Sequence, residues 1–230
     1  MNDRRILTAE SVTEGHPDKV CDAIADQVLD ACLAEDPGAR VACEVMATAG
    51  KITVAGEITA RVLPDIPAIA ARTVREIGYE ADYEIEVLTH DQSPDIAEAV
   101  DGGRQTGAGD QGVVYGYACL ETDELLPLPV VLAHRLTRNL TNARKLGTIR
   151  GLGPDGKAQV SVEYLFGLPS RIVSVPCPPC CTQDVYSALL AVPAVKRSSA
   201  LRVRVYACPP EISVSSNARA ERFLSTPSSE

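Results

Sequence analysis

The sequence predicts an α+β fold, on the strength of three observations. Segments with helical periodicity and segments with strand-like alternation follow one another as helix, hairpin, helix and strand, which is typical of α+β domains. Two of the alternating segments are separated by only two residues, which favours an antiparallel hairpin. The chain has 230 residues, enough for one large domain or two small ones with a substantial core.

The first predicted elements are a short strand over residues 6–8 and an amphipathic helix over about residues 18–33. One stripe of that helix is apolar: Ile24, Val28 and Cys32. Pro17 suits the first helical position, where a missing N–H costs nothing, so His16 falls at the cap. The dipeptide Pro37-Gly38 ends the helix.

Two alternating runs, residues 40–48 and 51–59, predict a β-hairpin with a two-residue Ala-Gly turn. That turn places Glu44 opposite Ala55, so that Glu57 is its diagonal neighbour on the same face, roughly 7–8 Å away. Both carboxylates then lie on the face opposite the apolar one. The alternative is a hairpin with its acids on the solvent side, which the pattern alone favours.

The later elements are predicted from the same patterns: a helix over 67–77, a strand over 83–89, a polar loop over 90–106, a strand over 113–118, a helix over 129–145 and a strand over 157–164. A loop of this length is usually functional or mobile, and a gating lid is one interpretation. The stripe of Leu132, Leu136 and Leu140 marks the buried side of the last helix. We assign no chemistry to His134 on that helix, and interpret it as a surface or partly packed residue.

Residues 107–112 match the pattern G-x-G-x-x-G, but the context excludes a Rossmann fingerprint. That motif must leave a strand and open a helix, whereas here a polar loop precedes it and a predicted strand follows. The glycines are better suited to tight turns and close approach to a ligand. The sequence also lacks a P-loop motif.

Composition excludes some classes of function. The net charge of −9 argues against nucleic acid as a partner, and no apolar run is long enough to span a membrane. No signal-peptide core follows the N-terminus, so we expect a cytoplasmic protein. Cys21, Cys32, Cys43 and Cys119 are expected to be reduced thiols inside elements.

Charge is unevenly distributed. Residues 165–230 contain seven basic and four acidic side chains, a net of +3, which leaves −12 for the first 164 residues. Residues 165–230 also hold eight of the 16 prolines and four of the eight cysteines. The character of the chain therefore changes near residue 164.

The helix mouth, residues 15–19, carries an imidazole, a carboxylate and an ammonium. Free backbone N–H groups and the helix dipole attract phosphate to such a position. A carboxylate beside phosphates, here Asp18, is a natural half-site for Mg²⁺. The alternative is an ordinary helix start with a histidine cap.

Several motifs together resemble the S-adenosylmethionine synthetase (methionine adenosyltransferase) family. The most specific are Gly-His-Pro-Asp-Lys at residues 15–19 and Gly-Ala-Gly-Asp-Gln-Gly at residues 107–112. The others, in family order, are residues 10–14, 41–44, 56–59, 92–96, 133–136, 154–157 and 159–160. The resemblance implies repeated β-α-β-β-α-β type domains, with helices on one face of a mixed or antiparallel sheet.

The resemblance implies that ATP and L-methionine are joined to S-adenosylmethionine, with release of phosphate and pyrophosphate. His16 would contact the bridging oxygen and assist the leaving triphosphate, and Asp18 would hold Mg²⁺. Asp155 and Lys157 would contact ATP, with Lys157 steadying the departing charge. Because the attacking sulfur is neutral, the reaction needs alignment and charge stabilisation and no general base.

The same resemblance implies a second group of ligands. Glu44 would help to bind K⁺, and Glu57 and Gln92 would contact methionine. Asp110 would face the nucleoside and methionine region. Bound cations would then explain the strongly acidic first 164 residues.

The resemblance runs through about residue 175 and implies this organisation: an N-terminal domain over 1–97, a flexible loop and linker over 98–110, a partial central domain over 111–175 and a divergent tail over 176–230. The run Pro-Cys-Pro-Pro-Cys-Cys at 176–181 cannot form the central strand expected there. We interpret the tail as out of frame or otherwise non-native. A zinc site on Cys177, Cys180, Cys181 and Cys208 is the rival interpretation, weakened because Cys208 has no close cysteine partner.

Family members are considerably longer, and their later phosphate-binding basic residues and third domain have no counterpart here. The family is built from dimers with active sites between subunits, so we expect a homodimer or a dimer of dimers. The alternative to an active enzyme is a non-catalytic truncated fragment, or a pairing partner that retains only the fold.

Overall fold

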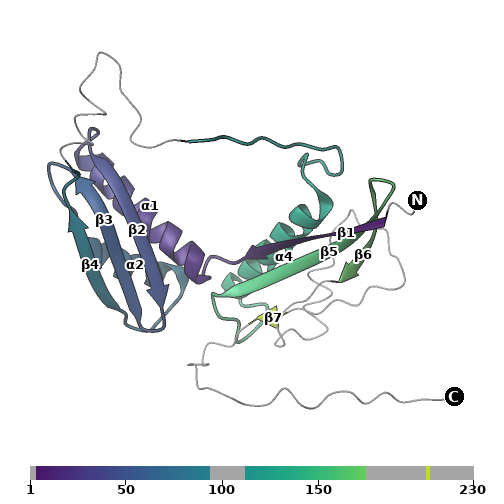
Figure 1. Cartoon of the computed structure of the whole chain (residues 1–230). Helices are drawn as coiled ribbons and strands as arrows, with labels where there is room; N and C mark the ends of the chain where they lie inside the picture. The colour runs from purple at the N-terminus through teal and green to yellow at the C-terminus, as the bar shows by residue number, and fades with distance from the viewer. Residues whose placement is uncertain (1–3, 94–111, 175–205, 208–230) are drawn as a thin grey trace.

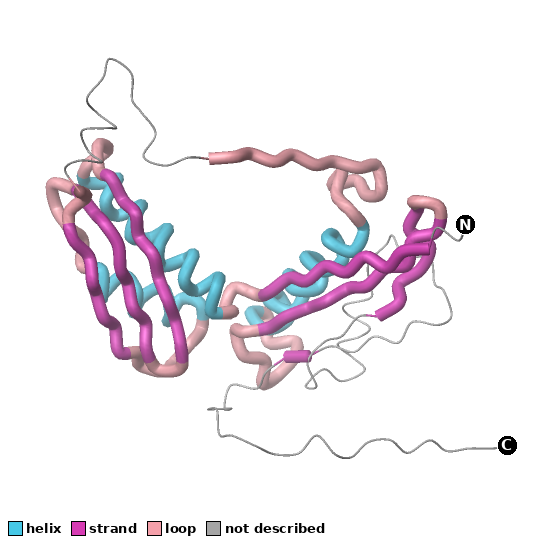
Figure 2. The backbone as a smooth tube through the Cα atoms, viewed as in Figure 1, coloured by secondary structure: helices cyan, strands magenta, loops and turns pink. Residues whose placement is uncertain are grey.

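A computed structural model describes residues 4–93, 112–174 and 206–207 of the chain. Figure 1 shows two sheets side by side, one covered by two helices and the other by one, and Figure 2 shows the same division by secondary structure. One sheet has the order β2-β3-β4, and the other has the order β1-β5-β6 with β7 also paired to β5. The α+β prediction is confirmed.

The first sheet is mixed, because β2 and β3 are antiparallel and β3 and β4 are parallel. The pairing of Glu44 with Ala55 and of Ala42 with Glu57 confirms the predicted hairpin register. Helices α1 and α2 pack on one face of this sheet (Figure 1). The elements are α1 (Pro17–Glu35), β2 (Arg40–Thr48), β3 (Lys51–Thr59), α2 (Ile66–Ile77) and β4 (Glu84–His90).

The second sheet takes its first strand from the start of the chain. Strand β1 pairs antiparallel with β5 along its whole length, from Arg4 opposite Leu165 to Val12 opposite Lys157. The junction segment, residues 13–16, therefore runs from the second sheet to helix α1 of the first. The elements are β1 (Arg4–Val12), α4 (Leu128–Lys145), β5 (Gly156–Leu165), β6 (Leu168–Ser174) and β7 (Tyr206–Ala207).

The first sheet and helices α1 and α2 form a first lobe, and the second sheet and helix α4 form a second lobe. The core of the first lobe lies between its two helices and its sheet. Ile24, Val28 and Cys32 are completely buried on the predicted stripe of α1. They meet Ile52 and Val54 of β3, which are also fully buried. Each such side chain stabilises the fold by about 1.5–3 kcal/mol relative to its exposed state. Burial raises the pKa of the Cys32 thiol, in keeping with the predicted reduced cysteine.

The core of the second lobe lies between α4 and β5. Leu132, Leu136 and Leu140 form the predicted stripe, and they pack against Val160 and Val162. The two lobes thus have separate cores, and the junction segment connects them.

One predicted strand is wrong, one observed strand was not predicted, and two segments lie wholly or mostly outside the described residues. The strand predicted over 113–118 is wrong, because residues 112–119 form no strand. Val113, Val114 and Tyr115 are 71–96% exposed. No described strand lies beside this segment to complete a hydrogen-bonded ladder. Strand β6 was not predicted, although Phe166 and Gly167 form the positive-φ turn that leads into it. The loop over 94–111 and most of the tail lie outside the described residues.

Candidate functional site

The helix mouth is built as predicted, with His16 at the N-cap of α1 and Pro17 at the first turn. The His16 Nδ1 accepts a hydrogen bond from the Asp18 backbone N–H at 3.3 Å. Because Nδ1 accepts this hydrogen bond, the other ring nitrogen, Nε2, is the one that can donate to an anion. The Asp18 carboxylate is 81% exposed, so it is accessible to a cation.

The junction segment brings the loop before β5 to the same place. Thr13 N–H donates to Gly156 O at 2.8 Å, and Gly15 N–H donates to Pro154 O at 3.1 Å. Asp155 consequently lies close enough to His16 for an electrostatic interaction. Burial raises the pKa of the Asp155 carboxyl above its ordinary value, and the His16 imidazole opposes that rise.

Lys157 stands at the start of β5, opposite Val12 of β1. Its Nζ lies 2.5 Å from Glu10 Oε2, and its side chain is about half exposed. The ammonium is thus engaged by a carboxylate at the surface, where a more highly charged anion can compete for it. His16, Asp18, Asp155 and Lys157 therefore gather around the junction segment. We call them the ATP set, after the role that the resemblance implies, with Asp18 as the expected Mg²⁺ ligand.

Glu44 and Glu57 lie on the first sheet and Gln92 lies just beyond its strand β4. We call these three residues the methionine set, after the role expected of Glu57 and Gln92, and Glu44 is the residue expected to help bind K⁺. Glu44 and Glu57 share the face that points away from the helices, as the hairpin register predicts. The parallel pairing of β3 with β4 places His90 opposite Glu57, with His90 Nε2 3.4 Å from Glu57 Oε1. The Gln92 amide oxygen accepts a hydrogen bond from Arg40 at 3.0 Å.

Glu57 and Gln92 lie near the end of helix α1 that is opposite to His16. His16 caps its N-terminus, whereas the Arg61 N–H at the end of β3 donates to Asp36 at its C-terminus. Gln92 is also fixed at that end, since its N–H donates to Thr59. A helix of 19 residues is about 28 Å long, so one chain holds Glu57 and Gln92 far from the helix mouth.

No cluster of three or more His, Cys, Asp or Glu side chains suited to a metal occurs within the described residues. The donor set nevertheless fits a magnesium ion that takes most of its ligands from phosphate and water, because Asp18 offers one exposed carboxylate. Glu44 likewise offers a single exposed carboxylate to a cation. Asp110 lies outside the described residues.

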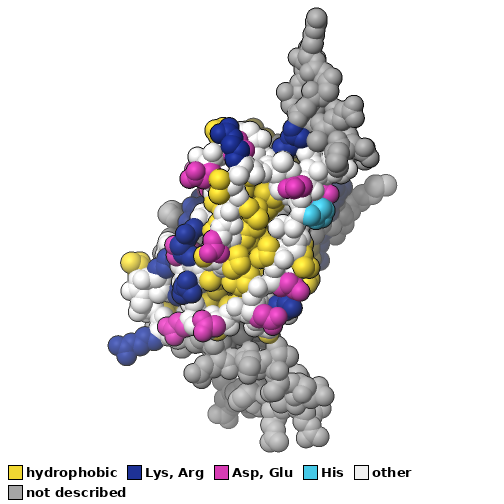
Figure 3. Space-filling view, turned by 90° about the vertical axis from the view of Figure 1, so that its left-hand side faces the viewer, with side chains coloured by type: hydrophobic (Ala, Val, Ile, Leu, Met, Phe, Trp, Pro, Cys, Tyr) yellow, Lys and Arg dark blue, Asp and Glu magenta, His cyan; other side chains and the backbone are white. Residues whose placement is uncertain are grey.

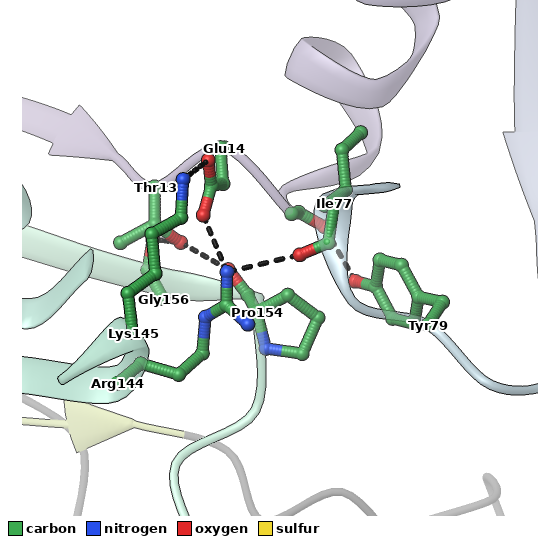
Figure 4. A network of polar contacts seen from close by, with 9 residues as sticks. Thr13, Glu14, Ile77, Tyr79, Arg144, Lys145, Pro154 and Gly156 are labelled. Carbon is green, nitrogen blue, oxygen red and sulfur yellow. Dashed lines mark hydrogen bonds and ion pairs between the residues drawn. The ribbon is translucent and has the colours of Figure 1, made fainter. Parts of the chain in front are cut away.

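One feature of the site was not predicted from the sequence. Glu14, itself one of the matched motif residues, is paired with Arg144 and Lys145 of the last turn of α4 (Figure 4). A basic pair at a helix C-terminus is common for dipole reasons alone, so the sequence carries no signal for this contact.

Among the described residues, no helix is long and apolar enough to cross a membrane.

Comparison with known proteins finds matches over most of the chain. Residues 4–100 match the family model of the S-adenosylmethionine synthetase N-terminal domain, and residues 105–188 match that of its central domain. The chain is 48% identical over 191 residues to an S-adenosylmethionine synthase from Nocardia farcinica, covering 74% of this chain and 47% of that protein. It is 46% identical over 192 residues to one from Salinispora tropica, covering 75% and 48%.

The chain spans about half the length of the curated relatives it matches. The central-domain match reaches residue 188, beyond the point at which the sequence pattern changes. Two consecutive domain models in family order, together with the helix mouth and the hairpin acids in the expected register, show that the chain belongs to the S-adenosylmethionine synthetase family.

Proposed function

We propose that the chain takes part in methionine adenosyltransfer, forming S-adenosylmethionine from ATP and L-methionine. A lone pair of the methionine sulfur attacks C5′ of ATP and forms the S–C5′ bond, while the C5′–O bond breaks and its electron pair leaves with the triphosphate. Water then cleaves the triphosphate into pyrophosphate and phosphate. The observation that carries this proposal is the convergence of His16, Asp155 and Lys157 at the junction segment.

In this reaction the ATP set stabilises the charge of the leaving group. The His16 Nε2–H would donate to the bridging oxygen of the triphosphate, because its Nδ1 is already occupied by the cap hydrogen bond. The Lys157 ammonium would exchange Glu10 for a phosphate oxygen. Such preorganised donors are typically worth a factor of about 10²–10³ in rate.

Mg²⁺ bound by Asp18 would neutralise phosphate charge, and K⁺ near Glu44 would help to order the site. Glu57 can accept hydrogen bonds from the methionine ammonium, and Gln92 can hydrogen-bond to its polar atoms. Asp110 is proposed to face the nucleoside. These assignments are supported by the exposed carboxylate of Asp18 and by the common face of Glu44 and Glu57.

We also propose that a second copy of the chain completes the site. The separation of Glu57 and Gln92 from the helix mouth along α1 supports this, since the methionine set of one copy could meet the ATP set of another. The outward face of the first sheet is suited to such an interface, because Met46 and Leu88 are 66% and 55% exposed. Figure 3 shows hydrophobic side chains in the middle of one face, with charged side chains around the margin.

The experiment that tests the proposed reaction is an assay with ATP, methionine, Mg²⁺ and K⁺, in which S-adenosylmethionine is detected by mass spectrometry. His16→Asn keeps a good N-cap but removes the imidazole donor, so it separates catalysis from helix stability. We expect this variant and Lys157→Ala to lower the rate by about 100-fold or more. Arg72→Ala is the control, because Arg72 is also a half-exposed basic side chain paired with a carboxylate, that of Glu76, but it lies on helix α2, outside the site residues and the outward face of the first sheet.

A folded chain that forms no product and binds no nucleotide would contradict the proposed activity and favour the non-catalytic alternative. For the second copy, sedimentation should show a dimer that Met46→Lys dissociates. Dissociation without loss of product formation would contradict the shared site.

A further inference from the structure

A single guanidinium links three segments where the two lobes meet. Arg144 Nη2, near the end of α4, donates to Glu14 Oε1 at 2.5 Å and to the backbone oxygen of Ile77 at 2.9 Å. The Arg144 side chain is only 18% exposed. Lys145 reaches the other oxygen of Glu14 at 2.7 Å, but its side chain is 53% exposed (Figure 4).

The contact with α2 is built into the end of that helix. Ile77 is its last residue, so its carbonyl has no partner within the helix, and an arginine donor satisfies it. Gly78 follows with φ +115°, and a Cβ at this position would lie 2.6 Å from Arg144 Nη1. Glycine here both permits the left-handed backbone and leaves room for the guanidinium.

The junction segment is also held by direct contacts to both lobes. From the first lobe, the Tyr79 hydroxyl donates to the Gly15 carbonyl oxygen at 2.5 Å. From the second, the Pro154 carbonyl oxygen accepts from Thr13 Oγ1 at 2.7 Å and from the Gly15 N–H at 3.1 Å. The next residue in the chain is His16, so any displacement of the segment moves the imidazole relative to Asp155.

We propose that Arg144 is a positioning residue, which clamps the junction segment through Glu14 and the end of α2 and thereby fixes His16 against Asp155. The effect of Arg144 on nucleotide binding rests on the function proposed above. The clamp itself is a property of the two lobes and can be measured without any ligand. Arg144 does not touch the reacting atoms and acts only through the segment that it holds.

The test measures amide hydrogen exchange and the binding of Mg²⁺ with a non-hydrolysable ATP analogue in the full chain. Arg144→Met retains the aliphatic length and removes the donors. We expect the Gly15 and His16 amides to exchange at least tenfold faster in this variant, and the analogue to bind at least tenfold more weakly. Lys145→Met should change both by less than twofold, because Lys145 holds only Glu14 and is exposed.

A second control separates positioning from general stability. Arg171→Met removes another guanidinium that is paired with a carboxylate, that of the buried Glu163, but between β5 and β6. It should leave exchange at residues 15–16 and analogue binding within twofold of wild type. The proposal is overturned if Arg144→Met leaves exchange at Gly15 and His16 unchanged, or if Arg171→Met accelerates it equally. If the wild-type chain binds no analogue, the proposed function fails, and the exchange data alone decide whether the clamp exists.

Discussion

Replacing Gly15 by alanine tests how closely the junction segment packs against the loop before β5. A Cβ on Gly15 would lie 2.4 Å from the Pro154 carbonyl carbon, 2.5 Å from its oxygen and 2.6 Å from its Cβ. Ordinary contacts lie at 3.4–4 Å, so the two segments would have to separate by about 1 Å. None of these Pro154 atoms can rotate away as a flexible side chain would.

The cost of Gly15→Ala follows from those contacts. Overpacking against rigid neighbours costs about 1–3 kcal/mol, and the lost hydrogen bond from Gly15 N–H to Pro154 O adds about 1 kcal/mol. The free energy of unfolding, measured by urea titration with circular dichroism, should therefore fall by about 2–4 kcal/mol.

Gly116→Ala is the matched control for this substitution, because no atom lies within 4 Å of the Cβ it would add. Its unfolding free energy should stay within about 0.5 kcal/mol of the wild-type value. An equally small change for Gly15→Ala would refute the packing described here, since no arrangement of these segments at this distance tolerates a methyl group.

Three further substitutions test the core and the electrostatics. Ile24→Ala in the fully buried stripe of α1 should lower the unfolding free energy by about 2–5 kcal/mol. Leu33→Ala is the control on the same helix and should lower it much less, because Leu33 is 39% exposed. Similar losses in the two variants would mean that the stripe is wrongly placed. The hydrogen bond from Arg171 lowers the pKa of Glu163 in the folded protein. The ionised carboxylate therefore stabilises the fold at pH values above the unfolded-state pKa of about 4.3. This stabilisation is lost as the pH falls through the lower pKa of the folded state. Glu163→Gln should consequently destabilise the protein at pH 7, and its difference from wild type should shrink in urea titrations at pH 3; a difference independent of pH would exclude the ionic contribution. Burial raises the pKa of Asp155, so the ionised carboxylate opposes folding above its unfolded pKa of about 3.9. Asp155→Asn should therefore be more stable than wild type at pH 7 and equally stable below pH 3, while nucleotide binding is lost; a less stable variant at pH 7 would show that the carboxylate is held by favourable contacts instead.

The hairpin illustrates what the sequence was able to predict. Alternation and a two-residue turn determine a register in which every residue has one partner, so the common face of Glu44 and Glu57 followed without any tertiary information. The helix mouth was equally predictable, because capping depends on Pro17 and its immediate neighbours. In both cases the decisive contacts are local in the chain.

Contacts between distant segments were not predictable in the same way. The segment over 113–118 has the composition of a strand, yet it remains unpaired in the described part of the chain, because a strand requires a neighbour and not only a propensity. The pairing of β1 with β5 joins residues about 150 positions apart, and no local pattern indicates it. The contact of Arg144 with Glu14 depends on that pairing, so it could not be foreseen either.

The charges around the helix mouth lead to a last prediction. Lys157 is engaged by Glu10, and Lys19 is engaged by Asp22 at 2.8 Å. These two cations are therefore already neutralised, while the exposed Asp18 adds a negative charge where a triphosphate would bind. A polyanion can enter such a site only if it brings cations that satisfy the carboxylates, after which Lys157 is free to exchange Glu10 for phosphate. Calorimetric titration with the ATP analogue should accordingly show binding with Mg²⁺ and at least tenfold weaker binding with EDTA. Equal affinity under both conditions would mean that the protein's own basic side chains suffice, and that Asp18 does not act through a metal.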